Sequence, residues 1–207
     1  MARAYSPTEI LAKKYKLLDW GKEWKEAFGN PEASGVWFVW GNTSNGKSAF
    51  FMQLVKELAK LNKVYINDLE EGTSLTMQQN LLRSDIESVK KNILIGSENM
   101  EEMALRLSKR KSARFVIVNS FQYTGLSISA YRKLKEANKD KLIIFISHAK
   151  GKQPVGRTAD SVKFDASLKI WVEGFRAISN GRYNPGGTYT IWSEGANKYW
   201  GQKESKN

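Results

Sequence analysis

The feature that most constrains this chain is a phosphate-binding motif, GNTSNGKS, at residues 41–48. It matches the pattern G-x-x-x-x-G-K-[ST] over its full length. Five apolar residues, 36–40, precede the motif, and the apolar positions of residues 47–61 recur at four-residue steps. A buried strand, a glycine-containing loop and a helix are therefore predicted in the order that a phosphate loop requires.

Each part of the motif has a role toward a phosphate chain. Gly46 lets the backbone amides approach the phosphate oxygens, Lys47 reaches the terminal phosphates, and the Ser48 hydroxyl is a magnesium ligand. We therefore expect ATP and Mg²⁺ as cofactors. The expected nucleotide-binding residues are Gly41, Asn42, Thr43, Ser44, Asn45, Gly46, Lys47, Ser48 and Ala49.

Short apolar runs predict the strands of an α/β fold. They cover residues 36–40, 63–67, 92–95, 114–118, 142–147, 168–173 and 188–192. The first five alternate with helical or polar segments of crossover length, which is typical of a mainly parallel sheet covered on both faces. Asn-Gly and Pro-Gly-Gly turn signals separate the last two runs, so we expect an antiparallel C-terminal extension of the sheet.

The two ends of the chain are expected to differ from this central domain. Residues 6–28 are predicted to be helical because Ser6, Pro7 and Glu9 form a start signal and Gly29 follows the end, with a break near Gly21. We therefore expect residues 1–30 to be a helical segment packed on the core and residues 31–200 to be one domain. The segment GQKESKN, 201–207, is expected to be a disordered tail.

Composition limits the partners and the chemistry. The formal net charge of +12, from 33 Lys and Arg against 21 Asp and Glu, favours a polyanionic partner, with nucleic acid ahead of a membrane surface. The absence of cysteine excludes disulfides and thiolate chemistry, and a single histidine excludes a multi-histidine metal site. No apolar run approaches the ~20 residues of a membrane span. We expect a soluble cytoplasmic protein.

Polar residues at strand ends are the candidates for catalysis. Glu70 and Glu71 follow the strand 63–67, at the edge of a parallel sheet where ligands bind, and Glu70 is our first choice to polarise an attacking water. The alternative is a pair of solvated loop carboxylates. Asn119 ends the strand 114–118, where an Asp would hold magnesium through water. Its amide oxygen can still bond a metal-bound water but carries no negative charge, so nucleotide binding is a firmer expectation than hydrolysis.

The strand 142–147 leads to a histidine and a basic loop. His148 is expected beside the γ-phosphate, where it can relay the state of the nucleotide, although a structural role is equally compatible with a lone histidine. Lys150, Lys152 and Arg157 lie among glycines and suit contacts with the phosphates of a nucleic-acid strand. A solvated charged loop is the alternative.

These motifs, in this order, resemble the RecA-like ATPase core, in particular that of the hexameric replicative helicases and the RadA/Sms branch-migration proteins. The resemblance covers about residues 36–193. It rests on GNTSNGKSAF, YINDLEEGTSLTMQQNLLR, FVIVNSFQ, IFISHAKGKQPVGRTADSVKFDASLKIWVEGFR and NGRYNPGGTYTIW, the last being similar to a basic segment of RadA-type proteins.

The resemblance implies a three-layer α/β/α fold and assigns roles to residues. Glu70 is implied to be the catalytic glutamate, His148 the sensor, residues 150–160 a DNA-contacting loop, and Arg182 the arginine that acts on nucleotide at a subunit boundary. It also implies a homo-oligomer, a ring or filament, on single-stranded DNA. Asn119 departs from the family pattern, and the length leaves no room for the family's accessory domains. The short length is therefore consistent with a core-only member of the family from a phage or mobile element, which would act in the host cytoplasm if phage-encoded.

Four functions remain open on the sequence. The leading one is a DNA-stimulated ATPase of recombination or replication. The second is an ATP-dependent transposition regulator or helicase loader. The third is a small-molecule phosphotransferase, for which YRKLKEANKD, 131–140, is a weak candidate lid. The fourth is a nucleotide-binding structural protein in which Asn119 marks lost hydrolysis.

Overall fold

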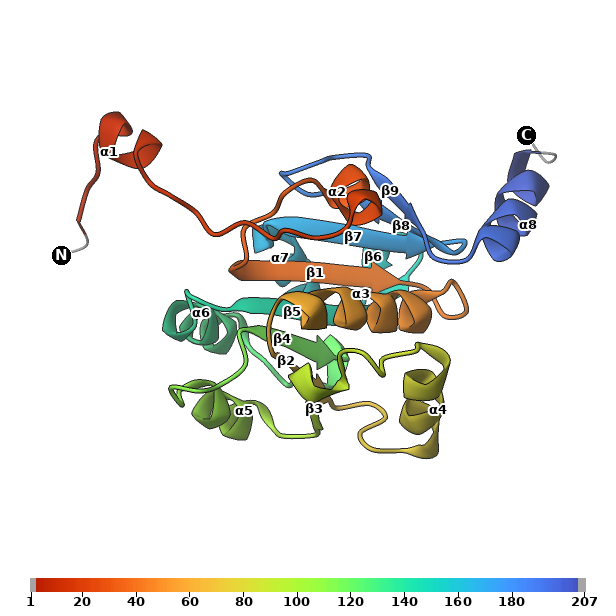
Figure 1. Ribbon diagram of the computed structural model, residues 1–207, viewed down its shortest axis with the longest axis horizontal. Helices are drawn as coiled ribbons and strands as arrows, with labels where there is room; N and C mark the ends of the chain where they lie inside the picture. The colour runs from red at the N-terminus through yellow and green to blue at the C-terminus, as the bar shows by residue number, and fades with distance from the viewer. Residues whose placement is uncertain (1–2, 205–207) are drawn as a thin grey trace.

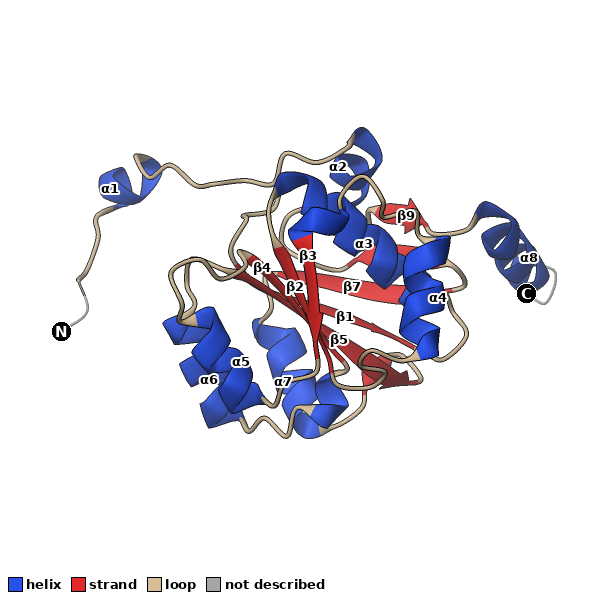
Figure 2. Cartoon of the chain, turned by 60° about the horizontal axis from the view of Figure 1, so that its bottom comes forward, coloured by secondary structure: helices blue, strands red, loops and turns tan. Residues whose placement is uncertain are grey.

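The computed structural model describes residues 3–204, which form a nine-stranded sheet with helices on both faces (Figure 1, Figure 2). Six parallel strands make its body, in the order β3 (Ile93–Gly96), β2 (Val64–Asp68), β4 (Phe115–Asn119), β5 (Leu142–Lys150), β1 (Gly35–Gly41) and β7 (Leu168–Glu173). Two antiparallel strands, β8 (Arg176–Ser179) and β9 (Thr188–Thr190), extend it, and β6 (Gln153–Pro154) forms a hairpin with β5. The parallel sheet with an antiparallel C-terminal extension is confirmed.

All seven predicted strands are present, but β6 and β8 were not predicted. β8 is only four residues long and begins with a charged residue, so it produces no apolar run. Its position follows from the turn at Gly174 and Phe175, which folds it back along β7. Sequence periodicity cannot identify such a strand, because its burial is supplied by its neighbours.

Alternate residues of the strands bury two separate cores. On one face, Trp37, Val39 and their neighbours pack under α2 (Lys22–Phe28), α3 (Lys47–Leu61) and α4 (Leu75–Arg83). On the other, Phe38, Trp40 and their neighbours pack under α5 (Met100–Leu107), α6 (Ile128–Ala137) and α7 (Arg157–Asp165). Figure 2 shows these two helical layers on opposite sides of the sheet. The two-residue period of a strand therefore builds a three-layer fold.

The helical segment expected over residues 6–28, with a break near Gly21, is wrong over residues 12–21. The structure has a short helix α1 (Pro7–Leu11), an extended segment, and then α2. Ser6 and Glu9 do form the expected capping box, but α1 buries no residue and lies away from the sheet (Figure 1). An isolated helix of fewer than about 12 residues is marginal in water, and α1 has no packing against the body to extend it. Only the part from Leu18 to Phe28 packs on the core.

The expected disordered tail is also wrong in part. Helix α8 (Ser193–Glu204) continues through residues 201–204, while residues 205–207 lie outside the described part of the chain. Trp200 anchors this helix by donating its indole N–H to the carbonyl of Gly174, at 3.1 Å. Within residues 3–204, none of the helices is long and apolar enough to cross a membrane.

The unequal packing of the N-terminal region leads to a stability prediction. Trp24 is 6% exposed and its ring stacks on Tyr189 at a centroid distance of 4.5 Å, whereas Leu11 is 87% exposed. Trp24→Ala should lower the free energy of unfolding by about 3–5 kcal/mol. Leu11→Ala, the matched control, should change it by less than about 0.5 kcal/mol. Guanidinium unfolding measures both, and similar losses would show that α1 packs on the body.

Candidate nucleotide-binding site

The phosphate loop lies at the carboxyl end of β1 and passes directly into α3. Gly41 ends the strand so close to β7 that a Cβ there would lie 2.5 Å from the carbonyl oxygen of Val172. Gly46, the residue before the helix, has φ of 93°, a left-handed conformation that glycine adopts without strain. Both glycines of the motif are therefore required by this backbone path.

Two asparagines of the motif fasten the loop to neighbouring turns. The side-chain oxygen of Asn45 accepts the backbone N–H of Gly174 at 2.8 Å, and its carbonyl accepts that of Phe175 at 3.1 Å. On the other side, the Asn42 amide donates to the carbonyl of Gly151 at 3.0 Å. These residues occupy unspecified positions of the motif, so sequence reasoning did not give them a structural role. They hold the loop between the β7–β8 and β5–β6 turns.

The start of α3 has the properties of an anion site. No side chain in the described part of the chain caps its N-terminus, and none of the ion pairs among residues 3–204 includes Lys47. Burial lowers the pKa of Lys47, and the carboxylate of Glu70 acts in the opposite direction. A partly buried ammonium beside uncapped helix amides fits the phosphates of a nucleotide.

Glu70, Asn119 and His148 meet at this same carboxyl edge. The register places His148 opposite Gly41 and Asn119 opposite Asp68. The Nε2 atom of His148 lies 3.3 Å from Oε2 of Glu70, and each side chain is about one-third exposed, at 32% and 31%. The residues expected as sensor and water-polarising group are thus in contact beside the phosphate loop.

Asp68 is a site residue that sequence reasoning missed. It is fully buried at the end of β2, where one carboxylate oxygen accepts the N–H groups of Glu70, Glu71 and Gly72 at 3.1, 2.7 and 3.3 Å. Its other oxygen accepts the amide of Asn119 at 2.9 Å. An aspartate closing the apolar run VYIND was the available signal. The charge that Asn119 lacks is therefore present on the adjacent strand.

The oxygen donors of this edge fit magnesium only together with a nucleotide. Among the described residues, no group of three or more His, Cys, Asp or Glu side chains could hold a metal ion alone. Ser48, and Asn119 through water, would supply ligands, and Mg²⁺ ordinarily takes the rest from phosphates and water. The pKa of Glu71 is raised, first by burial and then by the negative charges of the neighbouring Asp68 and Glu70.

Gln122 is a second residue that the sequence did not single out. Its side-chain oxygen accepts the N–H of His148 at 3.0 Å and the hydroxyl of Ser120 at 2.9 Å. Its amide nitrogen donates to the hydroxyl of Ser147 at 2.8 Å and to the carbonyl of Val155 at 2.9 Å. One amide thus joins the ends of β4 and β5 to the basic segment that follows β5.

That basic segment differs from the open loop expected over residues 150–160. Lys150 is the last residue of β5, Lys152 lies in the turn of the β5–β6 hairpin, and Arg157 is the first residue of α7. All three side chains are exposed. The hairpin is stabilised by the carbonyl of His148, which accepts the N–H of Val155 at 3.0 Å. The three cations are therefore carried by ordered structure.

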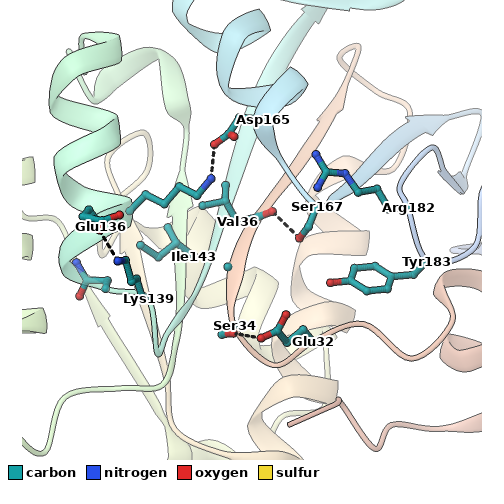
Figure 3. Close-up of a pocket in the computed structure, with 13 residues that line it drawn as sticks. Glu32, Ser34, Val36, Glu136, Lys139, Ile143, Asp165, Ser167, Arg182 and Tyr183 are labelled. Carbon is teal, nitrogen blue, oxygen red and sulfur yellow. Dashed lines mark hydrogen bonds and ion pairs between the residues drawn. The ribbon is translucent and has the colours of Figure 1, made fainter. Parts of the chain in front are cut away.

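Arg182 lies away from the other predicted site residues. It follows β8 at the amino edge of the sheet, where its N–H donates to the carbonyl of Ser167 at 3.1 Å. Figure 3 shows it beside Asp165 and Tyr183 in a cavity of about 310 Å³. Because the phosphate loop is at the carboxyl edge, Arg182 is not part of the nucleotide site of its own chain.

Comparison with known proteins identifies the fold and no more. No protein-family model and no curated protein matches the sequence. Among solved structures, a KaiC-like protein, PH0186, from the hyperthermophilic archaeon Pyrococcus horikoshii OT3 matches with a TM-score of 0.54. The sequences are 20% identical, and the match covers 76% of this chain and 81% of that one. The expected RecA-like α/β fold is thereby confirmed.

The hydrogen bond between Asp68 and Asn119 leads to a prediction of how a negative charge at position 119 changes the stability of the protein. Asn119→Asp removes the donor and places two carboxylates against each other, so it should lower the stability of the nucleotide-free protein by about 1–3 kcal/mol. Mg²⁺ with ATP should recover part of that loss, because a cation screens the pair. Urea unfolding with and without Mg²⁺-ATP measures this, with Asn197→Asp, at an exposed position of α8, as the control. An unchanged midpoint would contradict the contact.

The lowered pKa of Lys47 leads us to predict that the protein takes up protons when ATP binds. Burial lowers the pKa of Lys47 in the empty site, and a phosphate beside it should raise that pKa again. ATP binding should therefore take up protons at alkaline pH, and affinity should fall as the pH rises through the lowered pKa. Calorimetry in two buffers of different ionisation enthalpy counts these protons. Lys47→Arg is the control, since arginine stays charged. Equal proton uptake by the two proteins would show that a group other than Lys47 takes up the protons.

Proposed function

We propose that this chain binds Mg²⁺-ATP in the phosphate loop, hydrolyses it, and acts on single-stranded DNA in recombination or replication. The observation that carries the proposal is the meeting of Lys47, Glu70 and His148 at one edge of the sheet. A phosphate loop alone binds nucleotide, whereas hydrolysis also needs a group that orients water. Glu70 lies on the far side of the loop from the β7–β8 turn, in contact with His148.

The roles of the residues follow from their positions. Lys47 and the first amides of α3 hold the terminal phosphates and compensate their charge. Glu70 accepts a hydrogen bond from the attacking water and orients it, while His148 sets the position of that carboxylate. Asp68 fixes the backbone of residues 70–72 and the amide of Asn119. Mg²⁺, when bound, neutralises charge on the phosphate oxygens.

Charge and connectivity favour DNA as the partner. The net charge of +12 favours a polyanion, and Lys150, Lys152 and Arg157 are exposed on the β5–β6 hairpin and the start of α7. The hairpin is bonded to the phosphate loop through Asn42 and to His148 through Gln122. Occupancy of the nucleotide site can therefore alter the hairpin, and contact with DNA can alter the site.

The role that the resemblance implies for Arg182, taken with its position at the amino edge, favours a homo-oligomer, a ring or a filament. An arginine at the amino edge can act on nucleotide only if it reaches the carboxyl edge of a neighbouring copy. Such a head-to-tail contact is heterologous, and heterologous contacts generate rings or filaments.

One alternative retains specific support. An ATP-dependent transposition regulator or helicase loader needs ATP to control assembly and little turnover, and Asn119 in place of a carboxylate favours slow hydrolysis. The phosphotransferase alternative loses its candidate lid. Residues 131–140 form the second half of α6 and the turn that enters β5 at the amino edge, so they do not cover the phosphate loop.

Adjacent glutamates provide the test of hydrolysis. Glu70→Gln should keep ATP affinity within a few-fold and lower the ATPase rate about 100-fold or more, because it removes a charge that matters in the transition state. Glu71→Gln, the matched control, should change the rate little. Rates are measured with and without single-stranded DNA. Stimulation of the rate by DNA would favour the DNA-stimulated ATPase over the transposition regulator or helicase loader. If Glu71→Gln lowered the rate more than Glu70→Gln, the catalytic role would belong to Glu71.

Arg182 provides the test of a shared site. Arg182→Ala should leave ATP binding intact and abolish most of the DNA-stimulated rate, as loss of a charge-stabilising arginine does in other phosphoryl-transfer sites. Mixing it with Glu70→Gln should restore part of the ATPase rate, because some interfaces then combine an intact Arg182 with an intact Glu70. No recovery, with a monomer in sedimentation at saturating ATP and DNA, would contradict the oligomer.

A further inference from the structure

The amino edge of the sheet carries a concentration of positive charge that the nucleotide site does not use. The four segments that enter β3, β2, β4 and β5 lie side by side there, because these strands are parallel neighbours. Residues 62–63, 90–92, 108–114 and 139–141 contain one carboxylate, Asp140. Their cations are Lys63, Lys90, Lys91, Lys109, Arg110, Lys111, Arg114, Lys139 and Lys141.

A cavity of about 350 Å³ opens at this edge, between the starts of β2 and β3 and the end of α5. The described residues that line it include no carboxylate. Its cationic side chains are Lys63, Lys91, Arg106, Lys109 and Lys111, and Asn92 and Ser112 add polar groups. Val64, Ile93 and Ala113 form an apolar part of the wall, and Leu94, also at the cavity, is 54% exposed.

Three of the nine edge cations form ion pairs with exposed carboxylates: Lys90 with Glu87, Lys139 with Glu136 and Lys141 with Asp140. At the cavity itself, most of the positive charge is not neutralised within the described part of the chain. Of the five cations at the cavity, only Arg106 takes part in an ion pair of the described residues: its Nε and Nη2 atoms donate to Glu98 at 2.8 and 2.5 Å. Its guanidinium also lies over the ring of Tyr65, 5.0 Å from the centroid. Arg106 is thus a fixed part of the wall, and the four lysines remain available to a polyanion.

We infer that this amino-edge cavity and the cations around it bind the phosphate backbone of a nucleic-acid strand. Neighbouring strands lie about 4.8 Å apart, so four of them spread the charge over roughly 14 Å, which is long enough to contact successive phosphates of one nucleic-acid strand. A small polyphosphate would need only the cavity and not the flanking Arg110, Arg114 and Lys139. The exposed Leu94 and the apolar wall give a base a surface to pack on.

This surface is separate from the basic hairpin. β5 runs nine residues from the amino edge to Lys150, so the two surfaces are about 30 Å apart. The inference does not rest on ATP hydrolysis or on the hairpin. It shares only the class of partner with the proposed function, so variants of each surface can fail separately.

The first experiment compares variants that lose equal charge. The triple variant Lys63→Ala, Lys109→Ala, Lys111→Ala should bind a thymidine oligonucleotide more weakly without ATP, and its log–log salt slope should flatten by about 2, at roughly 0.7 per lost contact. The matched control is Lys22→Ala, Lys133→Ala, Lys198→Ala. A third triple changes Lys150, Lys152 and Arg157. Binding of the amino-edge triple equal to that of the control would overturn the inference, whatever the hairpin triple does.

The second experiment reports on the cavity itself. The chain has no cysteine, so Leu94→Cys can carry a single environment-sensitive dye, with Ser129→Cys on α6 as the control position. The dye at position 94 should respond to the oligonucleotide, and the dye at position 129 should not. Inorganic triphosphate should compete only at much higher concentration. A response to triphosphate as strong as that to the oligonucleotide, or no response to either, would overturn the assignment to nucleic acid.

Discussion

The parallel pairing of β1 with β5 on one side and β7 on the other is the constraint on which the site depends. It sets Gly41 opposite both His148 and Val172. Trp37, Phe38 and Val39 are fully buried and alternate between the two cores, so a slip of one residue would turn each side chain to the wrong face. The phosphate loop has one possible position, and the residues at the ends of β2, β4 and β5 meet it there.

Charge is divided between the two edges of the same sheet. Asp68, Glu70 and Glu71 lie at the carboxyl edge, where a nucleotide would add more negative charge. That arrangement favours nucleotide binding only with a cation, which is consistent with a site whose magnesium ligands are completed by the phosphates. The buried Asp68 is tolerated because four hydrogen bonds satisfy its carboxylate. The four lysines that line the amino-edge cavity take part in no ion pair among the described residues, so they are available to a polyanion from outside.

Sequence patterns predicted what depends on local chemistry and missed what depends on tertiary contacts. Apolar runs located all the strands except β6 and β8, and the motif located the loop, because burial and glycine conformation leave a direct signal in the sequence. The roles of Asp68 and Gln122 depend on which strands are neighbours, and adjacency in a sheet is not encoded locally. The prediction of a helix over residues 12–21 failed for the same reason. Leu11 and Tyr15 are four residues apart, which is a helical spacing, but the fold offers these side chains no surface to pack on and both are exposed.

The phosphate loop is held on one side by Asn45 and on the other by Asn42, and these two hydrogen-bonded connections, the Asn45 tether and the Asn42 tether, differ in how they can pass on a movement of the loop. The Asn45 tether leads to the β7–β8 turn, which α8 holds through Trp200, so this side of the loop is braced. The Asn42 tether leads to the β5–β6 hairpin, whose Lys150 and Lys152 are exposed, so displacement on this side of the loop reaches a basic surface directly. The amino-edge cavity lies beside the starts of β2 and β3, about 30 Å away at the opposite edge of the sheet, and among the described residues no hydrogen bond joins it to the loop. Nucleic acid held at the hairpin would therefore respond to the nucleotide, whereas nucleic acid held at the amino edge would remain bound through the ATP cycle.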